Sequence, residues 1–138
     1  MVCKSNIIWG KTKKKVEDII TKYTYYNLSI DDHSSFDVSL DSFVLQKLET
    51  NLEDAYSVLS PEEKQNRINF INYFRISFNR LTTDERKIIY WTYLDKEDNY
   101  DDRFIANSLG FSLGYYYIKK KETLIRFAYS LGVEETEK

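Results

Sequence analysis

Apolar side chains recur at intervals of three and four residues through most of this chain, as they do along one face of an α-helix. This spacing predicts a first helix over residues 12–26. It predicts a second helix over residues 41–59, whose apolar seam consists of Leu45, Leu48, Leu52, Ala55 and Leu59. A third helix is predicted to start at Ser60 and Pro61, because a serine cap followed by a first-turn proline is a typical start signal. Its apolar face carries Phe70, Ile71, Phe74 and Phe78.

Residues 81–133 carry the signals of three consecutive helices with a tight break before the last one. The first opens on a threonine followed three residues later by a glutamate, a capping-box spacing. Asp101 or Asp102 can cap a short second helix, and Gly110 can take the left-handed conformation that ends it. Ser112 can then cap the third helix. The pattern predicts an all-α protein with a C-terminal helix-turn-helix domain.

The last of these helices has two different faces when its residues are projected at about 100° per residue. The stripe expected to face the other helices consists of Leu113, Tyr116, Tyr117, Leu124, Phe127, Ala128 and Leu131. The side chains expected to project outward are Tyr115, Lys119, Glu122 and Arg126, with Lys120 and Lys121 near the borders. A basic, aromatic outer face on the third helix of such a trio is typical of base and phosphate contacts.

These residues resemble two related groups of proteins. The segment from Ile105 to Ser112 looks like the turn of the helix-turn-helix domains found in region 4 of sigma factors. The segment from Tyr115 to Ala128, with its tyrosines, its lysines, a glutamate and a closing Leu-Ile-Arg-Phe-Ala, resembles the autolysin-regulatory, or ArpU-type, phage transcriptional regulators. It departs from the usual pattern at Gly114, where such domains carry a polar base-reading side chain.

The resemblance implies a sequence-specific DNA-binding regulator that activates phage late or lysis-related genes in the cytoplasm of a Gram-positive host, with RNA polymerase as a further partner. Together with the helix projection, it assigns double-stranded DNA to Ser112, Gly114, Tyr115, Lys119, Lys120, Lys121 and Arg126. The residues expected to support the turn and its packing are Gly110, Ile105, Ala106, Leu109, Tyr116, Leu124 and Phe127.

The net charge of −2 is unusual for a nucleic-acid-binding protein, so the distribution of charge is more informative than its sum. Residues 1–15 carry five lysines and no acid, and residues 16–65 carry eleven acids against three lysines. Residues 112–126 carry four basic side chains against one acid. DNA would therefore meet the two basic ends. The first lysine cluster is either a basic arm on phosphate or a solvated helix start, and the sequence leaves both readings open.

No residues are spaced for catalysis or for a cofactor. The chain has one cysteine, Cys3, and one histidine, His33, so neither an internal disulfide nor a zinc-ligand cluster is expected. The aspartate pairs at 31–32 and 101–102 are better explained by capping and solvation than by paired-carboxylate catalysis. We expect no enzyme, no metal and no cofactor. The chain also has no apolar run of the roughly 20 residues that a membrane helix needs, and no signal-peptide pattern, which predicts a soluble cytoplasmic protein.

Four segments are expected along the chain. Residues 1–38 form a basic helix and a polar linker, residues 39–80 a helical hairpin, residues 81–133 the helix-turn-helix domain and residues 134–138 an acidic, frayed tail. The apolar faces of the hairpin belong either to an intramolecular core or to a homodimer interface through residues 41–80.

Two other functions compete with DNA binding. The negative net charge and Gly114 favour a helical protein-interaction module that binds a polymerase or a repressor and not DNA. A sigma-like subunit would need a promoter-melting aromatic and basic helix upstream, and we find none in the sequence.

Overall fold

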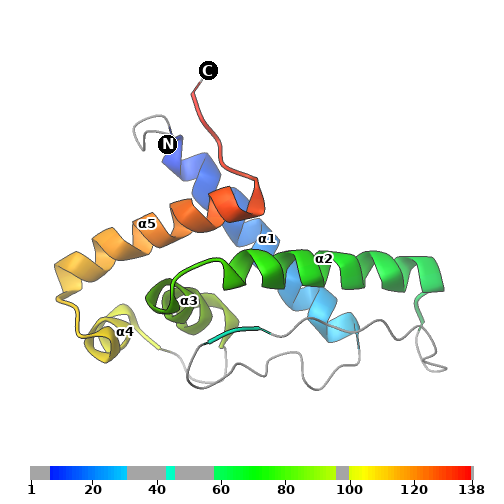
Figure 1. Cartoon of the computed structure of the whole chain (residues 1–138), viewed down its shortest axis with the longest axis horizontal. Coiled ribbons are helices and arrows are strands. Elements are labelled where there is room, and N and C mark those ends of the chain that lie inside the picture. The colour runs from blue at the N-terminus through cyan, green and yellow to red at the C-terminus, as the bar shows by residue number, and fades with distance from the viewer. Residues whose placement is uncertain (1–6, 31–42, 46–57, 96–99, 138) are drawn as a thin grey trace.

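The computed structural model describes residues 7–30, 43–45, 58–95 and 100–137 (Figure 1). Over these ranges the chain is all-α, as predicted. The helices are α1 (Trp9–Ser29), α2 (Pro61–Asn79), α3 (Thr83–Ile89), the π-helical η2 (Tyr90–Leu94), α4 (Asp102–Leu109) and α5 (Leu113–Leu131). In Figure 1, α1 passes behind α2 and the C-terminal part of α5, while α4 lies beside the N-terminal end of α5.

The starts of α2, α3 and α5 lie where local side-chain chemistry predicts them, whereas α1 begins at Trp9, three residues before its predicted start and without a side-chain cap. The hydroxyl of Ser60 accepts the backbone N–H of Glu63 at 3.2 Å, with Pro61 in the first turn. Thr82 and Glu85 form a complete capping box at the start of α3. Each such cap satisfies backbone donors that have no partner within the helix, which fixes where the helix begins.

The prediction of a helix over residues 41–59 is wrong for the residues of this range that the structure describes. Residues 43–45 are not helical, and neither are Val58 and Leu59. Asn79 accounts for the first of these differences, because its side chain donates to the carbonyl of Leu45 at 2.8 Å and accepts the Leu45 N–H at 2.9 Å. These bonds compete with helical hydrogen bonding. The rest of the predicted helix, residues 46–57, lies outside the described residues.

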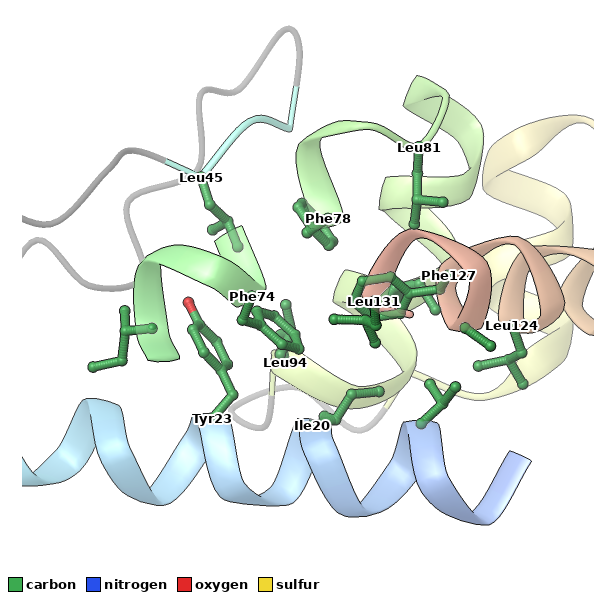
Figure 2. Close-up of a cluster of buried hydrophobic side chains, with 14 of the residues drawn as sticks. Ile20, Tyr23, Leu45, Phe74, Phe78, Leu81, Leu94, Leu124, Phe127 and Leu131 are labelled. Carbon is green, nitrogen blue, oxygen red and sulfur yellow. The ribbon is translucent and has the colours of Figure 1, made fainter. Parts of the chain in front are cut away.

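The main core is built chiefly from α1, α2 and the C-terminal half of α5, and Ile89 of α3 and Leu94 of η2 contribute to it (Figure 2). The rings of Tyr23 and Phe74 are stacked with centroids 3.8 Å apart. Phe127 of α5 presents its edge to Phe74 at 5.4 Å and to Phe78 at 6.4 Å. Because offset and edge-to-face arrangements are the favoured ones for aromatic pairs, these rings hold the three helices in one arrangement. The core thus joins residues from segments that the sequence predicted separately.

The acidic tail was predicted to be frayed, but Glu135 and Thr136 are paired with the start of the chain. The carbonyl of Glu135 accepts the N–H of Ile8 at 2.8 Å, and its own N–H donates to the hydroxyl of Thr12 at 3.1 Å. Lys15 forms an ion pair with the Glu135 carboxylate. The tail therefore lies against the start of α1, and Lys15 is engaged there. A pairing between residues so far apart in the sequence leaves no local pattern to predict it.

Candidate nucleic-acid interface

The turn between α4 and α5 is set by Gly110. Its φ of 73° and ψ of 25° lie in the left-handed region, and its N–H donates to the carbonyl of Asn107 at 3.1 Å. The next N–H, of Phe111, donates to the carbonyl of Ala106 at 2.9 Å. These bonds satisfy the last carbonyls of α4, and Ser112 then caps α5 by accepting the Tyr115 N–H. The chain therefore passes from one helix to the next in three residues.

We expect Gly110→Val to lower the free energy of unfolding by about 1 kcal/mol or more, because a β-branched residue is strained at positive φ. A Cβ at Gly110 would meet no atom within 4 Å, so the backbone strain alone is the cause. Urea unfolding of the two proteins measures the effect. Gly110→Asn is the control, since asparagine tolerates this conformation and should cost less. Equal stability of all three proteins would contradict the prediction.

A second, smaller core lies beneath the turn and fixes the direction of α5. It contains Ile88 of α3, Ile105 and Ala106 of α4, and Tyr116 of α5, all of them buried. The hydroxyl of Tyr116 donates to Asp102 Oδ1 at 3.0 Å, at the start of α4. The partly buried hydrophobic residues around this core are Trp91, Tyr100, Leu109, Phe111 and Leu113. The N-terminal half of α5 is thus held by α3 and α4, and its C-terminal half packs against α1, α2 and α3.

The three consecutive lysines of α5 point in different directions. Lys120 Nζ lies 3.1 Å from Asp102 Oδ1, the oxygen that also accepts the Tyr116 hydroxyl, so Lys120 ties α5 to α4. Lys121 is exposed, and its ammonium lies 5.2 Å from the centre of the Trp9 ring at the start of α1. Lys119 is half-buried. Successive helical residues are rotated by about 100°, so three neighbours cannot share one face.

Arg126 also has a partner within the protein. Its Nε lies 2.9 Å from Oε2 of Glu85, and the Glu85 side chain is completely buried at the start of α3. The Arg126 side chain is itself 57% exposed. The pair therefore attaches the C-terminal half of α5 to α3 while leaving part of the Arg126 side chain at the surface.

The exposed side chains at the start of α5 differ from the predicted outer face. Tyr117, predicted to lie on the inward stripe, is 50% exposed, and Tyr115 is exposed to the same extent. Ile118 was assigned to neither face and is 62% exposed. Together with the exposed Gly114 they form a surface that we call the α5 outer face: Gly114, Tyr115, Tyr117 and Ile118. In Figure 1 the N-terminal half of α5 extends beyond α1 and α2, in agreement with the exposure of these side chains.

The prediction that Tyr117 faces inward is wrong because it assumed a single inward stripe along the whole of α5, packed against one set of helices. The N-terminal half meets α3 and α4, whereas the C-terminal half lies between α1 and α2 and is buried over a wider arc. Thr123 and Ile125 are accordingly buried, although neither was predicted to be. The signal for Ile118 was available in the sequence, since it lies one turn after Gly114 on the same side of the helix.

Burial and hydrogen bonding raise the pKa of two tyrosines near this interface. For Tyr116 the causes are burial and the hydrogen bond to Asp102, and for Tyr93 they are burial and the charge of Glu17, whose Oε2 accepts the Tyr93 hydroxyl at 3.0 Å. Both phenols are neutral in the folded and unfolded chain below their ordinary pKa of 10.0. Above it, the unfolded chain loses these protons first.

We therefore expect the free energy of unfolding to fall as the pH rises above about 10. Urea unfolding at a series of pH values from neutral to alkaline measures this dependence. Tyr116→Phe should be less stable at neutral pH, because Asp102 loses a hydrogen bond, and should show a weaker alkaline decline. If the free energy of unfolding of Tyr116→Phe falls with pH as steeply as that of the wild type, groups other than Tyr116 cause the alkaline destabilisation.

The described residues contain no group of histidine, cysteine and carboxylate side chains suited to hold a metal ion. Cys3 and His33 lie outside the described residues. Among the described helices, none combines the length and the apolar character needed to cross a membrane.

Comparison of the chain with protein-family models, with curated proteins and with solved structures gives no match.

Proposed function

We propose that this protein is a sequence-specific DNA-binding regulator of transcription that inserts the N-terminal half of α5 into the major groove. The observation that carries the proposal is the α5 outer face itself. It lies at the start of a helix that follows a three-residue turn, and two separate cores hold that helix rigidly. A recognition helix needs this combination, because its N-terminal residues must reach base edges while the rest of the domain stays outside the groove.

The charges around the α5 outer face favour a polyanionic partner. Lys121 is exposed next to it on α5, and Arg103 is exposed on α4. The start of α1 lies close to Lys121 through Trp9, and three lysines of its first turns are exposed: Lys11, Lys13 and Lys14. We propose that these side chains contact phosphates on either side of the groove, since lysine and arginine supply most of the sequence-independent affinity of DNA-binding proteins.

The biological setting of the proposal rests on the resemblance to ArpU-type regulators. It comprises a bacterial cytoplasm, a target promoter for phage late or lysis-related genes, and recruitment of RNA polymerase. The protein would have no catalytic activity of its own in this role.

Selection of bound duplexes from a randomised library tests the proposal, with the full chain as bait. We expect a recurrent sequence to be enriched and the affinity for that duplex to fall steeply with salt. The slope of log affinity against log salt should become shallower by about 0.9 for each phosphate contact that is removed. Lys121→Ala and Arg103→Ala should each reduce it by about that amount if each contacts one phosphate.

Lys120→Ala is the matched control, because Lys120 is bound to Asp102 and carries the same charge on the same helix. We expect little change in its salt slope. Equal slopes in wild type, Lys121→Ala and Arg103→Ala would contradict the phosphate contacts, and the absence of any enriched or retained duplex would contradict DNA binding.

A second candidate function is a protein-interaction module, and one surface of α2 favours it. Tyr73 and Ile76 are exposed there, at 36% and 48%. Phe74 and Phe78 were part of the apolar surface for which a dimer interface was predicted, but both are completely buried in the core of the same chain. They are therefore not available to a second subunit. For a homodimer through α2, Tyr73 and Ile76 are the large apolar side chains that this helix leaves exposed. In that case Ile76→Asp should convert a dimer to a monomer in sedimentation experiments.

A further inference from the structure

The exposed positions in the first two turns of α5 lack the side chains that usually read purines. Bidentate contacts to guanine come from arginine or lysine, and those to adenine come from asparagine or glutamine. Residues 111–118 contain none of these four residue types. The Ser112 hydroxyl is already engaged in capping the helix. What remains at the surface is the α5 outer face, which is apolar apart from two phenol hydroxyls.

The major groove offers one apolar group to such a surface, the C5-methyl group of thymine. We infer that Ile118 packs on a thymine methyl group, with Tyr115 or Tyr117 beside it, so that the protein reads its site by apolar contact. This inference rests on the proposed function and specifies which base the helix selects. Ile118 has the largest exposed fraction of the three side chains, and it is the one whose side chain carries no polar atom.

Gly114 gives the face the shape that this contact requires. It lies one turn before Ile118, and a Cβ at this position would meet no atom within 4 Å. Its φ is not positive either, so the fold needs no glycine here. A glycine inside a helix is unfavourable relative to alanine. Its presence is explained if the helix backbone has to approach the base edges closely, which lets the short Ile118 side chain reach the methyl group.

The charges nearby favour DNA over a protein as the occupant of this face. Lys121 lies one turn after Tyr117 and Ile118 on α5, so an apolar protein partner that covered this face would desolvate its charge. The phosphates that border the major groove would neutralise it.

The test uses a randomised duplex library amplified with either thymidine or deoxyuridine triphosphate, since uracil differs from thymine only by the missing methyl group. We expect enrichment of a recurrent sequence from the thymidine library. In that duplex, replacing a single thymine by uracil at the contacted position should weaken binding about fourfold. This is the effect expected when one methyl group is no longer buried against Ile118. Replacing cytosine at the same position by 5-methylcytosine should strengthen binding by a similar factor.

Variants assign the effect to the α5 outer face. In Ile118→Ala the thymine and uracil duplexes should bind equally, whereas Ile118→Val should retain the preference. Lys121→Ala should weaken both duplexes alike. Gly114→Ala should raise the melting temperature and yet weaken binding to the thymine duplex, a pair of opposite changes that a loss of folding cannot produce.

Equal binding of the thymine duplex and every singly substituted uracil duplex would overturn this inference. The proposed function would stand if that binding were still sequence-specific and salt-dependent. A thymine preference that persists unchanged in Ile118→Ala would also overturn it. If neither library yields a retained duplex, the inference and the proposed function both fail.

Discussion

Phe127→Ala is expected to lower the free energy of unfolding by about 3–5 kcal/mol, the largest effect of any single substitution considered. The Phe127 side chain is completely buried, and its ring contacts both Phe74 and Phe78. Truncation removes these contacts and leaves a cavity where α5 meets α2, which the surrounding helices can fill only partly. We also expect a large loss of DNA affinity, because the C-terminal half of α5 would no longer be held in place.

Urea unfolding followed by circular dichroism measures this change. Tyr117→Ala is the control, since it removes an aromatic ring from the same helix at a position that is half exposed. We expect a change within about 0.5 kcal/mol there. A loss at Phe127 no larger than that at Tyr117 would contradict the central position of Phe127 in the core.

Glu85→Ala is expected to lower the free energy of unfolding by about 2–3 kcal/mol. The buried carboxylate has two roles, which the substitution removes together. Its Oε1 accepts the backbone N–H of Thr82 at 2.9 Å and completes the capping box of α3, while Oε2 lies 2.9 Å from Arg126 Nε on α5. Because the Arg126 side chain is largely exposed, we assign most of the loss to the cap and the cavity.

Glu85→Gln separates the two roles, since it keeps an oxygen for the capping bond but removes the charge that faces Arg126. We expect it to be more stable than Glu85→Ala. Comparing duplex affinities of Glu85→Gln and Arg126→Ala then tests the predicted DNA contact of Arg126. Equal affinity losses would mean that Arg126 acts by holding α5 on α3, and a larger loss in Arg126→Ala would indicate direct contact with DNA. Wild-type stability of Glu85→Ala would contradict both roles.

The features that were predicted correctly from the sequence depend on interactions between residues a few positions apart. Ser60, Thr82 and Ser112 cap helices because their hydroxyls meet backbone donors three residues away. Gly110 ends α4 because only a residue that tolerates positive φ fits there. The same local logic placed the apolar faces of α1 and α2, since helical spacing alone decides which side chains share a side.

The candidate site was predicted less well, because its composition depends on which helices pack on which. Lys120 carries the same charge as Lys121, but only Lys120 meets Asp102, a residue on another helix. Tyr117 and Ile118 are exposed because α1 and α2 cover α5 only farther along its length. Such choices follow from tertiary contacts, which helical periodicity does not specify.

Because α5 belongs to two cores, its proposed DNA-reading half depends on helices from the whole chain. A truncated chain that starts at Leu81 would lose the α1 and α2 residues of the main core, among them Phe74 and Phe78, whose rings contact Phe127. Apolar side chains on the C-terminal half of α5 would then be exposed. Transplanting the turn and α5 onto another scaffold would meet the same obstacle. If the proposed function holds, we expect substitutions that change the DNA target to fall in the first two turns of α5, because the later turns are packed against α1 and α2.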